Sequence, residues 1–195
     1  MGNKKSGLSF YNRRKKMNRG LLLGIGSYLF WGMVMIFIAF VLVFCFGIQT
    51  SVIGSGMEPT LYNAQKICIN RFVYFVSDPQ MGDVVVFLPH GDENNHYYVK
   101  RVVGVPGDTI QILNGWIYIN GAIYEDTEYY DKIVDGGIAV NPITLGDDEY
   151  FVLGDNRNNS EDSRSGDIGI VKKDYIVGEA WYAFKTGMVQ GGFLD

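Results

Sequence analysis

The chain has 195 residues, enough for one domain of ordinary size and an accessory segment. Its formal net charge is −4, but the first 20 residues carry seven of the 17 basic residues and no acidic one, so the remainder is formally −11. A folded part with this excess of acidic residues repels phosphates, which argues against nucleic acid as a partner.

Residues 20–48 contain no charged side chain. A bilayer core of about 30 Å needs about 20 apolar residues in a helix, so this run predicts a transmembrane helix over residues 21–48. The basic residues before it place the tail, residues 1–20, in the cytoplasm. Residues 49–195 are then predicted to form an extracytoplasmic domain.

The alternative for the apolar run is a cleaved secretory signal. Such a signal usually has an apolar region of about 7–15 residues and ends at a small-x-small cleavage site. This run is longer and ends in Phe44-Cys45-Phe46, which favours an uncleaved anchor.

The cysteines and histidines give no sign of a disulfide framework or a metal site. Cys45 falls in the predicted span and Cys68 in the outer domain, so this topology prevents them from pairing. His90 and His96 fall in a polar loop and are interpreted as surface residues. We expect no metal and no other cofactor.

The outer domain reads as short apolar strands separated by turns, so the predicted fold is mainly β, with antiparallel sheets. Two Asn-Gly pairs, at 114–115 and 120–121, predict hairpins because both residues tolerate positive φ. The acidic segment 125–135 lacks the spacing of a calcium loop and is expected to be solvated. The expected strands are 67–71 with 72–76 (a strand pair or one bent strand), 84–88, 97–104, 109–113, 116–119, 122–124, 150–153, 168–171 and 175–184.

Residues 54–61, Gly-Ser-Gly-Met-Glu-Pro-Thr-Leu, form the first candidate site. The small residues around Ser55 leave the backbone open to the carbonyl of another chain, which main-chain N–H groups can bind. By itself, Gly-Ser-Gly is also an ordinary loop sequence.

Lys100 is the second candidate. Side chains alternate across a strand, so Lys100 and Arg101 point to opposite faces, neither of which is wholly polar. Although most strand lysines are exposed, one of these two cations must lie against apolar surface, and alternation does not indicate which. A desolvated lysine has a lowered pKa, and its neutral amine is a competent general base for a hydroxyl nucleophile.

The third candidate is the polar loop 154–164, which directly follows a predicted buried strand. An ordinary surface loop would also be rich in Asn, Asp and Ser. However, Asp155 with Arg157, and Asp162 with Arg164, each set a carboxylate two residues from a guanidinium. Such pairs can hold the loop rigid beside a site.

Together these stretches resemble the bacterial type I signal peptidases, membrane-anchored serine proteases with a Ser-Lys dyad. The resemblance covers most of residues 50–185, and the anchor before an outside domain also fits. The matching runs occur in family order and are residues 54–61, 82–87, 98–108, 120–121 and 154–164.

The resemblance implies a role for each matched residue. Lys100 is the implied general base, and Ser160 is implied to orient it. The implied oxyanion and substrate-binding residues are Gly54, Ser55, Met57 and Tyr98, and the implied structural supports are Asp155, Arg157, Asp162 and Arg164.

The resemblance also implies the substrate and the location. The substrate is a preprotein whose signal segment lies in membrane lipid, with small residues one and three positions before the cleaved bond. It would bind as an added extended strand. The location is the cell membrane of a bacterium, of Gram-positive type, with a single pass.

One departure concerns the nucleophile. The family pattern Gly-x-Ser-Met-x-Pro-Thr has its nucleophilic serine immediately before Met, where this chain has Gly56. Ser55 is one residue early, and in an extended backbone it points away from Lys100. Thr60 matches a family threonine that is not the nucleophile. We therefore predict that the chain as written is inactive.

Two explanations for Gly56 stay open. The serine was removed by engineering, or the chain is a natural non-catalytic relative that binds exported subunits, for example of pili, and assists their assembly. Retention of Lys100, Ser160 and the 154–164 loop favours recent loss, whereas glycine rather than alanine favours a natural change. A third reading, self-cleavage as in repressor-type Ser-Lys proteases, is opposed by the membrane span and by the long excursion at 125–148.

Overall fold

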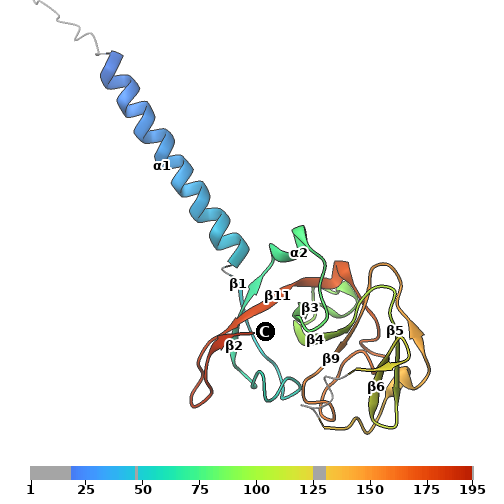
Figure 1. The fold of residues 1–195 in the computed structure, drawn as a ribbon. Helices are drawn as coiled ribbons and strands as arrows, with labels where there is room; N and C mark the ends of the chain where they lie inside the picture. The colour runs from blue at the N-terminus through green and yellow to red at the C-terminus, as the bar shows by residue number, and fades with distance from the viewer. Residues whose placement is uncertain (1–18, 47, 125–130, 195) are drawn as a thin grey trace, which may run out of the picture. The chain divides into compact units, whose positions relative to one another are not determined.

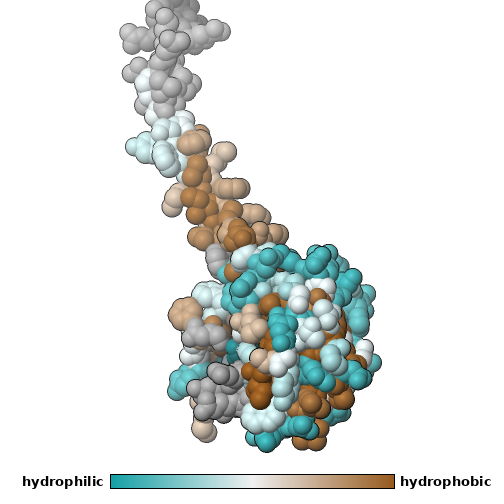
Figure 2. Space-filling view, turned by 45° about the vertical axis from the view of Figure 1, so that its right-hand side comes forward, coloured by the Kyte–Doolittle hydropathy of each residue, from teal (hydrophilic) through white to brown (hydrophobic). Residues whose placement is uncertain are grey.

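A computed structural model describes residues 19–46, 48–124 and 131–194. Its first element is α1 (Arg19–Phe46), in which residues 24–43 are long and apolar enough to cross a membrane by length and composition. Brown, the hydrophobic colour, covers much of α1 in Figure 2. The helix ends two residues before the predicted limit, because Ile48 already begins a strand. Residues 1–18 of the predicted tail lie outside the described part.

The larger sheet carries most of the β-rich part and is antiparallel at every pairing. Its order is β1-β2-β11-β3-β4-β9-β10, with β12 paired to β11 (Figure 1). The predicted mainly β fold of antiparallel sheets is confirmed. The strands are β1 (Ile48–Ser51), β2 (Lys66–Asn70), β3 (Val84–Phe87), β4 (Tyr98–Gly104), β9 (Glu149–Leu153), β10 (Val171–Lys172), β11 (Ile176–Ala183) and β12 (Gly192–Phe193).

The smaller sheet contains both predicted hairpins. Its order is β7 (Ala122–Ile123), β6 (Trp116–Ile119), β5 (Thr109–Leu113) and β8 (Ile143–Thr144). Asn114 and Asn120 have φ of 53°, and the glycine after each has φ of 82°. Both turns therefore use the left-handed backbone conformation that Asn-Gly tolerates, and the hairpin predictions are confirmed.

The apolar core fixes the 54–61 segment to the larger sheet. Met57 and Leu61 are fully buried and pack with Val52 and with Ile67 and Ile69 of β2. Burying a Met or Leu side chain stabilises a fold by about 1.5–3 kcal/mol. These two anchors hold the intervening backbone in place, although glycine and serine residues in the segment contribute little packing of their own.

The predicted strand at 72–76 is wrong, because this stretch contains the short helix α2 (Val73–Val76). The Asn70 side-chain oxygen accepts hydrogen bonds from the backbone N–H groups of Phe72 and Val73, at 3.1 and 3.3 Å. This contact turns the chain out of β2 and into a helical turn. Asparagine favours such local side-chain to backbone bonds over strand pairing.

The predicted strand at 168–171 is also largely wrong, since only Val171 belongs to a strand. Ile168 is buried, but it lies in a turn in which Ser165 O accepts the N–H groups of Ile168 and Gly169. Position 168 is therefore apolar because its side chain is buried, and not because it belongs to a strand.

The segment 125–135, predicted to be solvated, is only partly so. Residues 125–130 lie outside the described part, and of residues 131–135 only Ile133 is buried. The residues that follow, up to 148, include β8 and the 3₁₀ turn η3 (Gly137–Val140). Ile133 and Ala139 are buried against β5 and β6. Two further 3₁₀ turns, η1 (Pro89–Gly91) and η4 (Lys173–Tyr175), connect strands of the larger sheet.

Candidate active site

A cavity of about 280 Å³ brings the three candidate stretches together. Its walls come from residues 52–57, from residues 96–100 at the start of β4, and from residues 159–161 of the loop after β9. Long-range strand pairing explains this meeting, because β4 lies between β3 and β9 and the 154–164 loop leaves directly from β9.

Gly56 lies against Lys100 and Ser160 in this cavity. A Cβ atom on Gly56 would stand 3.0 Å from Lys100 Nζ and 3.2 Å from Ser160 Oγ. A side chain at position 56 therefore points at the amine. The hydroxyl of Ser55 is engaged elsewhere, because it accepts a hydrogen bond from Asn159 Nδ2 at 2.8 Å.

Both Lys100 and Arg101 are buried, with 7 % and 8 % of their surface exposed. We expected one of the two cations to lie against apolar surface, but both are buried, because β4 is covered on both faces. Arg101 forms a bidentate contact with Asp155. No described carboxylate forms an ion pair with Lys100.

Burial lowers the pKa of Lys100 from its ordinary value. The negative charges of Asp162 and Glu161 act in the opposite direction and only partly offset the loss of hydration. A buried amine with a lowered pKa is more often neutral at a given pH, which is the form that accepts a proton.

Lys100→Met is expected to raise the free energy of unfolding, by about 1.4 kcal/mol for each unit by which the pKa of Lys100 is lowered. The Lys100 amine binds its proton less readily in the native state than in the unfolded state, so the buried lysine destabilises the native state. This destabilisation is fully present below the lowered pKa and disappears as the pH rises towards about 10.4, the ordinary lysine value. Thermal unfolding from pH 6 to 10 measures the difference. Lys172→Met, at an exposed position of β10, is the control; equal pH profiles for all three proteins contradict the prediction.

Ser160 does not make the contact that the resemblance implies. Its Oγ is buried and has no hydrogen-bond partner among the described residues. A buried hydroxyl without a partner costs about 1–3 kcal/mol. Ser160 Oγ and Lys100 Nζ instead both face the empty side-chain position of Gly56.

The Gly154 backbone passes very close to the same point. A Cβ on Gly154 would overlap Ser160 Oγ and the carbonyl oxygen of Gly56. Next to it, Asn156 donates its backbone N–H to Gly56 O and its side-chain N–H to Ser55 O, both at 3.1 Å. The loop thereby fixes the backbone at position 56.

Gly154→Ala is expected to destabilise the protein by about 1–3 kcal/mol, the usual cost of overpacking. The added methyl must push Ser160 or the Gly56 carbonyl away, so the Asn156–Gly56 hydrogen bond should lengthen. Urea unfolding measures the cost. Gly166→Ala is the matched control, because a Cβ there has open space; similar losses for both variants contradict the prediction.

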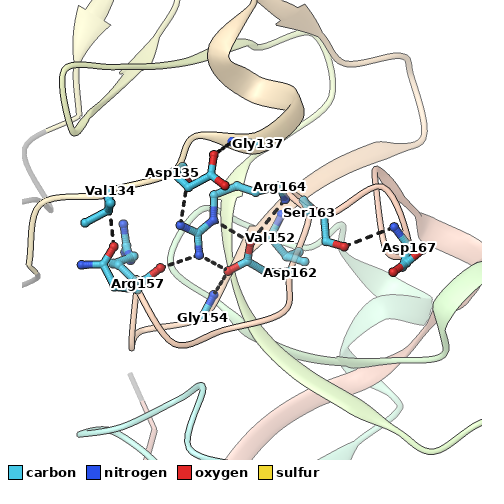
Figure 3. Close-up of polar contacts among 12 residues, drawn as sticks. Val134, Asp135, Gly137, Val152, Gly154, Arg157, Asp162, Ser163, Arg164 and Asp167 are labelled. Atoms are coloured by element: carbon cyan, nitrogen blue, oxygen red, sulfur yellow. Dashed lines mark hydrogen bonds and ion pairs between the residues drawn. The ribbon is translucent and has the colours of Figure 1, made fainter.

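Asp162 and Arg164 form the predicted ion pair within the loop, with a 2.8 Å contact between Arg164 Nε and Asp162 Oδ1. Figure 3 shows the Arg164 guanidinium held between this carboxylate and the carbonyl oxygens of Asp135 and Arg157. Asp162 also accepts the Gly154 N–H at 3.1 Å. These bonds hold the ends of the loop together.

The observed partner of Asp155 is Arg101 of β4, a contact that proximity in sequence did not indicate. Each of the two nitrogen–oxygen distances is 2.9 Å, and Asp155 also accepts the Thr60 hydroxyl at 2.6 Å. Asp155 therefore links the strand that carries Lys100 to the segment that carries Gly56. A buried arginine requires such a carboxylate, but the sequence did not show that Arg101 is buried, so it carried no signal for this pair.

The remaining implied binding residues line the cavity in different ways. The Gly54 N–H donates to Asn63 Oδ1 at 2.9 Å, whereas among the described residues the Gly56 N–H has no acceptor. Met57 contributes mainly to the core. The Tyr98 ring stacks on His96 with ring centroids 4.6 Å apart.

Tyr98 also donates its hydroxyl to Glu161 at 3.3 Å. Burial and the Glu161 charge raise the pKa of Tyr98. His96 and Glu161 were not among the predicted site residues, and as polar loop residues they carried no sequence signal that distinguished them from ordinary surface residues.

Comparison with known proteins gives one consistent match. A family model described as "Signal peptidase, peptidase S26" matches residues 26–184. A "Signal peptidase I P" of Bacillus subtilis subsp. natto is 40% identical over 133 residues, covering 64% of this chain and 70% of the relative. A "Signal peptidase I" of Bacillus amyloliquefaciens is 41% identical over 140 residues, covering 67% and 72%. A solved signal peptidase I from Enterococcus faecalis V583 has 28% identity and a TM-score of 0.39, covering 53% of this chain and 97% of that structure.

Proposed function

Because the chain belongs to the signal peptidase family, peptidase S26, we propose that its cavity is a type I signal peptidase site from which the attacking serine is missing. In this proposal position 56 is the nucleophile position, Lys100 is the general base and Ser160 completes their surroundings. The observation that carries the proposal is the direction of position 56, where a Cβ would stand 3.0 Å from Lys100 Nζ.

With a serine at position 56, the site has the groups for acyl transfer. The neutral amine of Lys100 accepts the hydroxyl proton while Oγ attacks the carbonyl carbon of the scissile bond. The backbone N–H of residue 56, which has no acceptor among the described residues, can donate a hydrogen bond to the developing oxyanion. Lys100 then returns the proton to the departing amine, and a water molecule activated by the same lysine hydrolyses the acyl intermediate. Gly56 supplies no hydroxyl, so this chain binds a precursor without performing the first step.

The substrate in this proposal is an exported preprotein that binds as an added strand. Ile53 is 65 % exposed, and among the described residues its backbone groups have no hydrogen-bond partner. An extended peptide can pair with this backbone while its small side chains enter the cavity. We further propose that α1 anchors the chain in a bacterial cell membrane, of Gram-positive type, with the basic tail in the cytoplasm and the β-rich part outside.

The test is binding without cleavage. The full chain in detergent micelles is expected to bind a fluorescent precursor peptide with Ala-x-Ala before the scissile bond and to release no product. Fluorescence anisotropy measures the binding, and mass spectrometry detects any product. The matched peptide has Leu at both alanine positions and should bind at least about tenfold more weakly, a difference of about 1.4 kcal/mol. Equal affinity for the two peptides, or product from the Gly56 chain, contradicts the proposal.

The second candidate is a natural non-catalytic homologue that binds exported subunits, for example pilin precursors, and assists their assembly. The observation in its favour is that the cavity walls and the supporting ion pairs are intact around Gly56. It predicts that changes in the cavity wall abolish assembly in cells while Gly56→Ser does not. The chromosomal codon for position 56 separates a natural glycine from an engineered one.

A further inference from the structure

We propose that Glu161 makes the candidate site select precursors with a basic residue at the middle position of the cleavage motif, between the two small residues. The inference rests on the proposed function and names a residue that sets its specificity. Glu161 lies in the loop after β9 and lines the same cavity as Gly56 and Lys100. A carboxylate at this place can recognise a lysine or arginine of the bound peptide by its charge.

The charges on the cavity wall favour a cation. Of the described residues that line the cavity, Lys100 is the one lysine or arginine, and Glu161 is the one carboxylate. Lys100 is 7 % exposed, and burial lowers its pKa. Its role as a base requires the neutral amine. With Lys100 and His96 neutral, Glu161 supplies the remaining charge of the cavity, which is negative.

The neighbours of Glu161 leave its carboxylate available to a ligand. Its hydrogen bond from the Tyr98 hydroxyl is long, at 3.3 Å. Among the described residues, no basic side chain forms an ion pair with Glu161. Asp155 and Asp162, in the same loop, each pair with a buried arginine. A carboxylate can accept several hydrogen bonds, so Glu161 keeps a capacity that these two aspartates have used.

Glu161 lies at the rim of the cavity, beside the start of β4. Its side chain is exposed although it lines the cavity, whereas Lys100 is buried. The bond from Tyr98 holds the carboxylate next to this strand. Tyr98 and Lys100 are two residues apart on one face of β4, a distance of about 7 Å along the strand. The carboxylate is therefore close to the peptide residues that flank the carbonyl at position 56.

Alternation of side chains along the peptide selects the middle position of the motif. Successive side chains of an extended chain point to opposite sides. When the two small residues of the motif point into the cavity, the residue between them points away from its floor and towards the rim. A lysine or arginine there has a long, flexible stem that can bring its charge to an exposed carboxylate.

The test measures the binding of precursor peptides to the full Gly56 chain in non-ionic detergent micelles by fluorescence anisotropy. One peptide has Ala-Lys-Ala before the scissile bond, and its matched partner has acetyl-lysine in the middle, which removes the charge. The charged peptide is expected to bind about threefold more tightly, as is usual for an exposed ion pair. This advantage should shrink as the salt concentration rises, because salt screens exposed charges.

Variants of the chain assign the effect to Glu161. Glu161→Gln should remove the advantage of the charged peptide. Glu93→Gln, at an exposed position of the loop before β4, should retain it. Glu161→Lys should reverse it, so that a peptide with Ala-Glu-Ala binds more tightly than the peptide with Ala-Lys-Ala. A reversed preference cannot result from loss of folding, so this variant tests the role of Glu161 even if another variant is unstable.

The outcomes separate this inference from the proposed function. If the acetyl-lysine peptide binds no more tightly than its counterpart with Leu at both alanine positions, the proposed function is contradicted. If that preference for alanine is present but lysine and acetyl-lysine bind equally, the role of Glu161 alone is overturned. A preference for lysine that survives Glu161→Gln, or that Glu93→Gln removes to the same extent, assigns the effect to the acidic surface as a whole and also overturns it.

Discussion

Gly56→Ser is expected to give a peptidase that cleaves an Ala-x-Ala precursor at least about 10³ times faster than the parent chain. The new side chain starts 3.0 Å from Lys100 Nζ, so the amine, at the end of a flexible side chain, needs to shift by only a few tenths of an ångström to accept the hydroxyl proton. Single-turnover cleavage of a labelled precursor, followed by mass spectrometry, measures the gain. The rate should rise with pH through the lowered pKa of Lys100, because only the neutral amine is a base.

Two variants control for the shape of the site. Gly56→Ala adds the same Cβ without a hydroxyl and should stay inactive. Gly56→Ser combined with Lys100→Met keeps the hydroxyl, removes the base and should return to the parent rate. A folded Gly56→Ser protein that fails to cleave the precursor refutes the assignment of position 56, and activity that survives Lys100→Met refutes the assignment of the base.

Asp155→Ala is expected to lower the free energy of unfolding by about 3–5 kcal/mol, because it leaves the buried Arg101 guanidinium without its bidentate partner. The side chains of this pair are 10 % and 0 % exposed, so water cannot replace the lost carboxylate. The Thr60 hydroxyl also loses its acceptor, which loosens the segment that carries Gly56. Urea unfolding of the full chain in micelles measures the loss.

The matched control is the exposed pair of Lys173 and Asp78, whose side chains are 38 % and 67 % exposed. Asp78→Ala should cost less than about 1 kcal/mol, as is usual for surface ion pairs. Replacing both buried partners, by Asp155→Leu with Arg101→Met, should cost much less than Asp155→Ala alone, because no charge is left unpaired. Equal losses for Asp155→Ala and Asp78→Ala contradict the role of burial.

Local sequence patterns predicted those elements whose conformation depends on near neighbours. The Asn-Gly pairs predicted both hairpins of the smaller sheet, and the β-branched run at 84–88 predicted β3. Prediction failed where an apolar residue is buried without being in a strand, as at Ile168, and where a side chain redirects the backbone, as Asn70 does before α2. Apolar character reports burial, and burial occurs in turns and helices as well as in strands.

The sequence by itself determined the absence of a hydroxyl at position 56, the presence of a lysine next to an arginine on one strand, and the apolar run that became α1. Only the tertiary structure decided that both Lys100 and Arg101 are buried, because alternation assigns a side chain to a face but does not say what covers that face. It also decided that Asp155 pairs with Arg101, 54 residues away, and that position 56 points at the lysine amine. These contacts join a strand to loops that are far apart from it in the chain, so they exist only once the sheet has brought these segments together.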